Sequence, residues 1–267
     1  MKPFLKWAGG KYRIIDRICK ELTPGKRLIE PFVGSGAVFL NTNYDNYLLC
    51  DINKDLINLY MTLQQEGPRF IKYCSTFFTA ENNNENRYYE LRDSFNKTKD
   101  KQKKAALFLF LNKHGYNGLC RYNASGEFNS PFGKHIKPYF PANEMLYFWE
   151  KSQRAEFQCC DFRDAMAQAT PGDVVYCDPP YVPLNATANF TEYSAGGFTL
   201  SDQRDLVRLA QLSAAGIPVL ISNHDTEFVR TEYATAKLIA FDVQRYISCN
   251  GQNRSKVSEV LAFFGGR

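Results

Sequence analysis

The sequence lacks a long apolar segment. Its longest apolar run covers only 105–111, whereas a membrane-spanning helix needs roughly 20 such residues. Residues 1–11 contain no apolar run of the kind found in signal peptides. We therefore expect no membrane span and a cytoplasmic location.

Paired cysteines and clustered histidines are also absent from the sequence. The eight cysteines include no CxxC pair, and the three histidines, His114, His135 and His224, are scattered. This pattern does not match the common zinc motifs and provides no disulfide framework. We expect reduced, packed thiols and no bound metal.

Positive charge is modest overall but concentrated in one segment. The formal net charge is +5, yet 97–154 alone contains 11 Lys and Arg against 4 Asp and Glu. This concentration indicates a surface that faces a polyanion. An ordinary solvated helix face explains 99–104 equally well, but it explains less of the aromatic and glycine-rich stretch that follows.

Short apolar runs bounded by turn residues recur along the chain, and helical patterns separate the early runs. This alternation predicts an α/β fold with a largely parallel sheet. The last two runs are joined by a polar loop too short for a crossover helix, so we expect them to pair antiparallel at the sheet edge. The predicted strands are 27–31, 47–50, 156–160, 174–177, 218–222, 238–243 and 257–264.

Residues 55–154 interrupt this alternation. Their pattern is helical over 56–63, 88–95 and 103–113 and then hairpin-like, with Gly126 in the turn. None of the predicted strands falls inside this segment, and it contains the excess of positive charge. We therefore predict a main domain formed by 1–54 and 155–267 and an inserted second domain formed by 55–154.

The stretch RLIEPFVGSGAVFLN, 27–41, has the pattern of a strand, a glycine-containing turn and a helix. Gly34 and Gly36 permit close approach to a ligand, and the helix start offers unpaired N–H groups. Phe39 occupies the position of the third glycine in the dinucleotide fingerprint, so the turn alone is weak evidence. The next predicted strand ends in Asp51, where a ribose-binding acid belongs in this fold class. Together the two features indicate a nucleotide-like ligand.

Two further segments each have two interpretations. Asp161 either bonds the amino group of an adenine, whose ring Phe162 covers, or caps the helix predicted at 163–169. The segment KWAGGK, 6–11, places Trp7 beside two glycines and two lysines. It either closes over a ligand or is an exposed N-terminal segment.

The strand at 174–177 leads into the tetrapeptide DPPY. Neither proline has an N–H group, so Asp178 and the carbonyl of Pro179 form a stiff, acceptor-only pair. Such a pair matches an exocyclic amino group, which offers two N–H donors. Accepting both hydrogens frees the nitrogen lone pair for attack. Tyr181 can stack on the base. Simple strand termination by the prolines explains neither flanking residue.

Two loops adjoin these motifs. Residues 183–199 have the composition of a loop over a site, or of a long connection. In KHGYNGLCRYN, 113–123, Arg121 is of the type that reads guanine bidentately, and Tyr116 or Leu119 can wedge between base steps. Packing in a hairpin core is the other interpretation of these side chains.

With KWAGGK, EPFVGSGAVFLN, YNGLCRYN, EFNSPFGK and VVYCDPPY in this order, the chain closely resembles the Dam family of DNA adenine-N6 methyltransferases, of the α group of amino-methyltransferases. The likeness extends over nearly the whole chain, from Lys2 to Leu261. It implies a Rossmann-like methyltransferase fold with a seven-stranded sheet, and an inserted helical domain with a β-hairpin that recognises the target. It also implies S-adenosylmethionine (AdoMet) as methyl donor and the adenine of duplex GATC as acceptor.

The resemblance assigns roles at matching positions. Asp178, Pro179, Pro180 and Tyr181 are similar to the family's catalytic tetrapeptide. The family's cofactor contacts are matched by Trp7, Lys11, Asp51 and Asp178. The resemblance also places the 32–36 turn, including Phe32, Gly34 and Gly36, beneath the methionine moiety of AdoMet. The family's base readers resemble Lys6 and Arg121, its intercalating and neighbouring contacts Tyr116 and Asn117, and its further target contacts Leu119 and Pro131. Lys134 and His135 stand where relatives carry a basic and an aromatic residue.

We therefore expect a monomeric enzyme that flips adenine out of duplex DNA, methylates N6, needs no metal, and is nucleoid-associated when bound. Two alternatives stay open at this point. One is methylation of RNA adenine or of cytosine N4, and the other is a DNA-binding regulator without catalysis. Housekeeping, prophage-borne and restriction-linked enzymes share this chemistry, so the motifs do not distinguish these roles.

Overall fold

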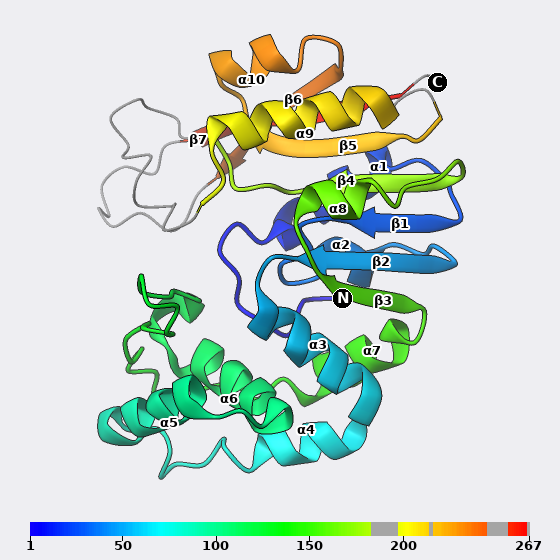
Figure 1. Ribbon diagram of the computed structural model, residues 1–267. Coiled ribbons are helices and arrows are strands. Elements are labelled where there is room, and N and C mark those ends of the chain that lie inside the picture. Colours follow the sequence, from blue (N-terminus) through cyan, green and yellow to red (C-terminus); the bar gives the residue numbers. More distant parts are fainter. Residues whose placement is uncertain (183–196, 214–215, 245–255, 266–267) are drawn as a thin grey trace.

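The computed structural model describes residues 1–182, 197–213, 216–244 and 256–265. Its centre is a seven-stranded sheet with the strand order β3-β2-β1-β4-β5-β7-β6 (Figure 1). Most of the loop predicted at 183–199, including Phe190 and Tyr193, lies outside the described residues. The strands are β1 (Arg27–Glu30), β2 (Asn46–Asp51), β3 (Ala155–Cys159), β4 (Asp173–Cys177), β5 (Val219–His224), β6 (Lys237–Gln244) and β7 (Lys256–Phe264).

The strand directions follow from the connections between them. β3, β2, β1, β4 and β5 pair in parallel, whereas β7 lies antiparallel between β5 and β6. Parallel neighbours need crossover segments, and the short link after β6 allows only an antiparallel return. The predicted mostly parallel sheet with an antiparallel C-terminal pair is confirmed.

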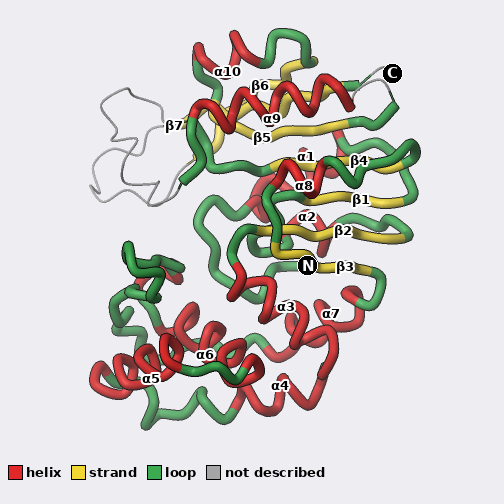
Figure 2. The backbone as a smooth tube through the Cα atoms, viewed as in Figure 1, coloured by secondary structure: helices red, strands yellow, loops and turns green. Residues whose placement is uncertain are grey.

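Helices cover both faces of the sheet, as Figure 2 shows. Apart from the edge strand β3, which contributes to one cluster only, alternate side chains of the strands enter two separate hydrophobic clusters, one on each face. One cluster contains side chains of α1 (Ile15–Glu21) and α2 (Ala37–Asn41), preceded by the short helix η1 (Lys11–Ile14). The other contains side chains of α8 (Phe162–Met166), α9 (Leu200–Ser213) and α10 (Glu227–Glu232).

Residues 55–154 contribute helices and a hairpin but no strand of the sheet. The helices are α3 (Lys54–Glu66), α4 (Pro68–Ser75), α5 (Glu85–Lys97), α6 (Lys101–His114), η2 (Tyr116–Gly118) and α7 (Ala142–Ser152). Their apolar side chains belong to the same cluster as the α1 and α2 face of the sheet. No described helix is long and apolar enough to cross a membrane.

The predicted hairpin is present, although its two arms pair through isolated bridges and do not form regular strands. Its turn is closed by a hydrogen bond from the amide of Gly126, whose φ is +74°, to the carbonyl of Asn123, 2.9 Å. Isolated antiparallel bridges join Tyr122 to Phe128 and Gly115 to Phe132. Backbone hydrogen bonds also join the two arms, among them one from the amide of Asn129 to the carbonyl of Arg121 at 2.9 Å.

The cysteines follow the prediction with one exception. The seven described cysteines are all free thiols, and Cys50, Cys74 and Cys177 are buried. Cys159 is exposed, contrary to the expected packing. Cys159 is the last residue of the edge strand β3, and it lies beyond Phe157, the buried residue on the same face of that strand.

Candidate functional site

The carboxyl ends of β2, β1 and β4 lie side by side in the sheet, which brings three predicted motifs together. The strand order reverses between β1 and β4, and ligands of open α/β sheets bind at such a switch point. The glycine turn follows β1, Asp51 ends β2, and Asp178 follows β4. Segments remote in sequence thus form one candidate site at the carboxyl ends of these strands.

The glycine turn has the left-handed backbone that its sequence predicts. Gly34 and Gly36 have φ values of +47° and +72°, a region that residues with a Cβ rarely adopt. A Cβ on Gly34 would lie 2.8 Å from Nε1 of Trp7. The Trp7 indole therefore sits against this turn, which favours its interpretation as part of the site over an exposed N-terminal segment.

Asp51 is tied to the turn by backbone hydrogen bonds. Its Oδ2 accepts from the amide of Gly34 at 3.1 Å, and its Oδ1 accepts from the amide of Asn53 at 2.9 Å. Burial raises the pKa of Asp51, and these amide donors oppose that rise. Each carboxylate oxygen keeps a second lone pair, so a hydroxyl-bearing ligand can still be bound.

Asp161 and Phe162 adopt a compact structural arrangement. Asp161 caps α8, because its Oδ1 accepts from the amide of Arg163 at 2.9 Å. The Phe162 ring is buried, stacked on Phe32 at 5.5 Å and tilted against Phe198 at 5.3 Å. The capping interpretation is thus confirmed, and the adenine contact stays a prediction.

The carboxylate of Asp178 is held by a cation and a hydroxyl. Its Oδ1 pairs with Nζ of Lys11 at 2.9 Å and accepts from Oγ of Ser222 at 2.9 Å. Burial raises the pKa of Asp178, while Lys11 and Ser222 act in the opposite direction. Oγ of Ser222 also lies 3.1 Å from the hydroxyl of Tyr176, and both side chains are buried.

Tyr181 is fixed by contacts around its ring and at its hydroxyl. Nζ of Lys11 lies 4.3 Å from the ring centroid, in cation–π geometry. The ring meets His224 edge-on with a centroid distance of 4.7 Å, and its hydroxyl donates to Oε2 of Glu259 at 3.2 Å. Lys11 therefore contacts both ends of the tetrapeptide.

The N-terminal segment connects this site to the 115–121 turn. The buried side chain of Asn112 accepts from the amide of Lys6 at 3.0 Å and donates to its carbonyl at 2.7 Å. Nδ2 of the Asn112 side chain also donates to the carbonyl of Gly118 at 3.1 Å. KWAGGK thus runs from the hairpin region at Lys6 to Asp178 at Lys11.

The segment after α6, which contains several of the predicted DNA contacts, lies on the side of the molecule where β1, β2 and β4 end (Figure 1). Tyr116 and Leu119 are exposed, and Nε of the exposed Arg121 donates to Asn129 at 2.8 Å. Nζ of Lys6 lies 3.1 Å from Nε2 of His135. The amide of Tyr116 donates to the carbonyl of Pro131 at 2.9 Å, and Asn117 and Lys134 adopt positive φ values of 52° and 53°.

Sequence reasoning missed three residues of the site. Ile52 follows Asp51 and is 75% exposed. Its position as an apolar residue directly after a buried strand is a signal in the sequence that could have marked it. Ser222 lies at the centre of β5 with no motif to mark it. Glu30 ends β1 fully buried, and its Oε1 has no hydrogen-bond partner among the described residues. Burial raises the pKa of Glu30 to about 8.

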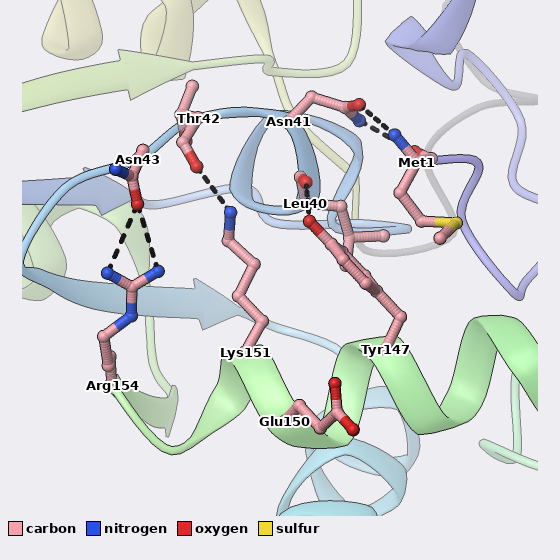
Figure 3. A pocket seen from close by; sticks show the side chains of 9 residues that line it. All are labelled: Met1, Leu40, Asn41, Thr42, Asn43, Tyr147, Glu150, Lys151 and Arg154. Atoms are coloured by element: carbon pink, nitrogen blue, oxygen red, sulfur yellow. Dashed lines mark hydrogen bonds between the residues drawn. The ribbon is translucent and has the colours of Figure 1, made fainter.

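A hollow of about 590 Å³ between the end of α2 and α7 is a weaker candidate (Figure 3). Its cations already contact the end of α2 and the residues after it: Lys151 donates to the carbonyl of Thr42, and Arg154 donates to Asn43 at 3.3 Å. Cations at a helix C-terminus stabilise that end of the helix. The lining residues are Met1, Leu40, Asn41, Thr42, Asn43, Tyr147, Glu150, Lys151 and Arg154.

Comparison with known proteins supplies the family that this geometry leaves open. A profile of the D12 class N6 adenine-specific DNA methyltransferases matches residues 7–247. The chain belongs to this family. As a D12 class member it is an enzyme that methylates N6 of adenine in DNA. The predicted family and activity are confirmed, and the alternatives of RNA or cytosine methylation and of a regulator without catalysis are not supported.

Relatives of this D12 class enzyme match it over nearly its whole length. The DNA adenine methylase of Serratia marcescens is 54% identical over 265 residues, which cover 98% of both chains. Those of Escherichia coli strain K12 and of Vibrio cholerae O1 are 51% and 49% identical. These two alignments cover 98% of this chain and 95% and 96% of the relatives.

Proposed function

We propose that the enzyme uses AdoMet and methylates the adenine of GATC in duplex DNA, with Asp178 and Tyr181 as catalytic residues. The observation that carries this is the acceptor-only tetrapeptide at the switch point, with its carboxylate oriented by Lys11 and Ser222. The sequence specificity rests on the resemblance of the 115–121 turn and hairpin to those of the Dam family.

The residues around the glycine turn fit a nucleoside-bearing cofactor. Asp51 presents a carboxylate to a ribose diol, and the exposed Ile52 beside it offers an apolar surface to a base. We assign further contacts to Trp7, Lys11, Phe32, Gly34, Gly36, Asp161, Phe162 and Asp178. When bound, AdoMet supplies a methyl group already activated on a sulfonium sulfur, so the proposed reaction needs no metal.

The chain's own part in transfer is to orient the amino group of the flipped base. The contacts of Asp178 with Lys11 and Ser222 both use Oδ1, so we assign Oδ2 and the carbonyl of Pro179 as the acceptors for N6. Accepting both hydrogens draws the nitrogen toward tetrahedral geometry, and the preorganised acceptors stabilise the charge that develops. Pro179 and Pro180 stiffen the pair, and Tyr181 stacks on the base.

Recognition of DNA is assigned to an inserted domain of residues 55–154, with Lys6 added from the N-terminal segment. Flipping an adenine costs a few kcal/mol, which contacts of the recognition surface must offset. We assign guanine reading to Arg121 and Lys6, intercalation to Tyr116, and further contacts to Asn117, Leu119, Pro131 and Lys134. We further propose a cytoplasmic monomer that is nucleoid-associated when bound.

Methylation of plasmid DNA tests this function directly. Treated plasmid is digested with nucleases that distinguish methylated from unmethylated GATC, and label from radioactive AdoMet is followed into adenine. We expect protection at GATC and label in N6-methyladenine. Protection at another sequence would reject the proposed target. Protection at GATC that is the same with and without AdoMet, and without label in adenine, would reject the cofactor.

The tetrapeptide is tested by Asp178→Ala in the same assay. We expect transfer to fall by at least about a thousandfold, since positioned acceptors of this kind supply several kcal/mol. AdoMet affinity, measured by calorimetry, should fall far less. Asp45→Ala, which removes an exposed carboxylate just before β2, is the matched control and should retain activity. Full activity of Asp178→Ala rules out the mechanism.

A further inference from the structure

A buried polar network lies directly behind the tetrapeptide. It consists of Gln203 on α9, Asn223 on β5 and Tyr233, which follows α10, and these three residues are named the clamp below. Gln203 is 3% exposed, and Asn223 and Tyr233 are fully buried. Burying three polar side chains is costly unless each is hydrogen-bonded, so the network requires an explanation beyond packing.

The clamp binds the backbone on both sides of Tyr181. Nε2 of Gln203 donates to the carbonyl of Pro180 at 2.8 Å. Oδ1 of Asn223 accepts from the amide of Val182 at 3.1 Å. The neighbouring His224 is also engaged, because its Nδ1 lies 2.7 Å from the carbonyl of Val182. The backbone that carries the Tyr181 ring is therefore held from the sheet and from α9 at once.

The orientation of each amide in the clamp is determined by the next. Because Oδ1 of Asn223 accepts from backbone amides, its Nδ2 faces Oε1 of Gln203 at 3.2 Å and the hydroxyl of Tyr233 at 3.0 Å. The Tyr233 hydroxyl also donates to Oε1 of Gln203 at 3.2 Å. Since Oε1 is occupied in this way, Nε2 of Gln203 points to Pro180. An apolar side chain of equal size cannot transmit this directionality.

We propose that the clamp residues are positioning residues, which hold Asp178–Tyr181 in the geometry that methyl transfer requires. The inference rests on the proposed catalytic role of the tetrapeptide and adds residues outside the cofactor and DNA contacts assigned above. Within the described part of the chain, the clamp makes no hydrogen bond to Asp51 or to the glycine turn. Asp178 is the one assigned cofactor contact in the segment that it holds, so it acts mainly on transfer and much less on cofactor binding. Misplacing a reactive group by about 1 Å costs on the order of a hundredfold in rate.

Gln203→Met tests the clamp, because it keeps the side-chain length and removes the donor to Pro180. We expect the single-turnover transfer rate, at saturating AdoMet and DNA, to fall about tenfold to a hundredfold. The dissociation constants of AdoMet and DNA should change less than about threefold, because binding and transfer are separable quantities. Gln211→Met is the control, since Gln211 lies on the same helix and contacts Thr235 at the surface.

A second variant covers the case in which Gln203→Met fails to fold. Tyr233→Phe removes one hydroxyl and keeps the ring, so about a threefold to tenfold loss of transfer rate at unchanged AdoMet affinity is expected. Wild-type transfer rates in both folded variants, or in Tyr233→Phe alone if the first does not fold, overturn the proposal. Asp178→Ala in the same series separates the two hypotheses: if it also retains activity, the tetrapeptide assignment has failed, and if it alone is inactive, only the clamp has failed.

Discussion

At the scale of single residues, the electrostatics of Asp178 determine how the proposed reaction depends on pH. The carboxylate must be ionised to accept hydrogen bonds from an amino group. Burial raises its pKa, and the contacts with Lys11 and Ser222 limit the rise. Transfer should therefore be complete above this raised pKa and be lost as the pH falls through it. The acid limb lies at higher pH than an ordinary aspartate would produce.

Ser222→Ala should move this acid limb to higher pH. The substitution removes a hydrogen bond that favours the ionised form of Asp178, so the pKa of Asp178 rises further. Profiles of transfer rate against pH measure the shift, and at alkaline pH the variant should approach the wild-type rate. Ser201→Ala, at an exposed position of α9, is the control. An acid limb at the wild-type pH in Ser222→Ala contradicts the role given to this contact.

At the scale of elements, the turn after α6 depends on the N-terminal segment that packs against it. Gly118 has a φ of +67°, and a Cβ there would lie 2.3 Å from Cβ of Lys6. Gly126 in the hairpin turn has a similar φ of +74°, but a Cβ there meets nothing within 4 Å. The two glycines therefore separate backbone strain from steric conflict.

Gly118→Ala should weaken DNA binding by about tenfold or more, since strain and displacement of Lys6 together exceed about 1.4 kcal/mol. Gly126→Ala carries only the strain, about 1 kcal/mol of stability, and should leave DNA affinity near the wild-type value. Fluorescence anisotropy with labelled GATC duplex measures both. Equal affinities for the two variants would show that the contact between Gly118 and Lys6 does not shape the recognition surface.

At the scale of the whole molecule, the helices of 55–154 and one face of the sheet share a single hydrophobic cluster. Phe148 of α7 is central to it. Its ring lies 5.1 Å from Phe4, 5.4 Å from Phe39 of α2, 4.7 Å from Tyr60 of α3 and 6.0 Å from Phe157 of β3. The segment that we assign to DNA recognition therefore shares a packed core with the sheet.

Phe148→Ala should destabilise the whole chain by about 3–5 kcal/mol, the cost of a large cavity in a packed core. Because the cluster is shared, calorimetry should show one cooperative transition in both wild type and variant. Leu146→Ala on the same helix removes a 39% exposed side chain and should cost no more than about 0.5–1 kcal/mol. Two separate transitions would show that 55–154 unfolds independently.

The strand pattern and the tetrapeptide were readable from the sequence because they depend on local properties. Alternation of apolar runs and turns determines which segments become strands, and a link too short for a crossover helix makes the C-terminal pair antiparallel. Gly34, Gly36 and DPPY have conformational limits of their own, independent of distant contacts. Ile52 followed from the same local logic, as an apolar residue after the last acid of a strand, and was overlooked.

The tertiary structure alone decided which side chains meet. Lys11 and Ser222 reach Asp178 from 167 and 44 positions along the chain, and such pairings arise only from the tertiary fold. Gln203, Asn223 and Tyr233 lie in unremarkable helical and strand segments, and only folding aligns their amides behind Pro180. Local sequence thus determined the elements and the reactive tetrapeptide. The tertiary fold as a whole determined the electrostatic partners and the support of the tetrapeptide, because hydrogen bonds and ion pairs depend on distances in space.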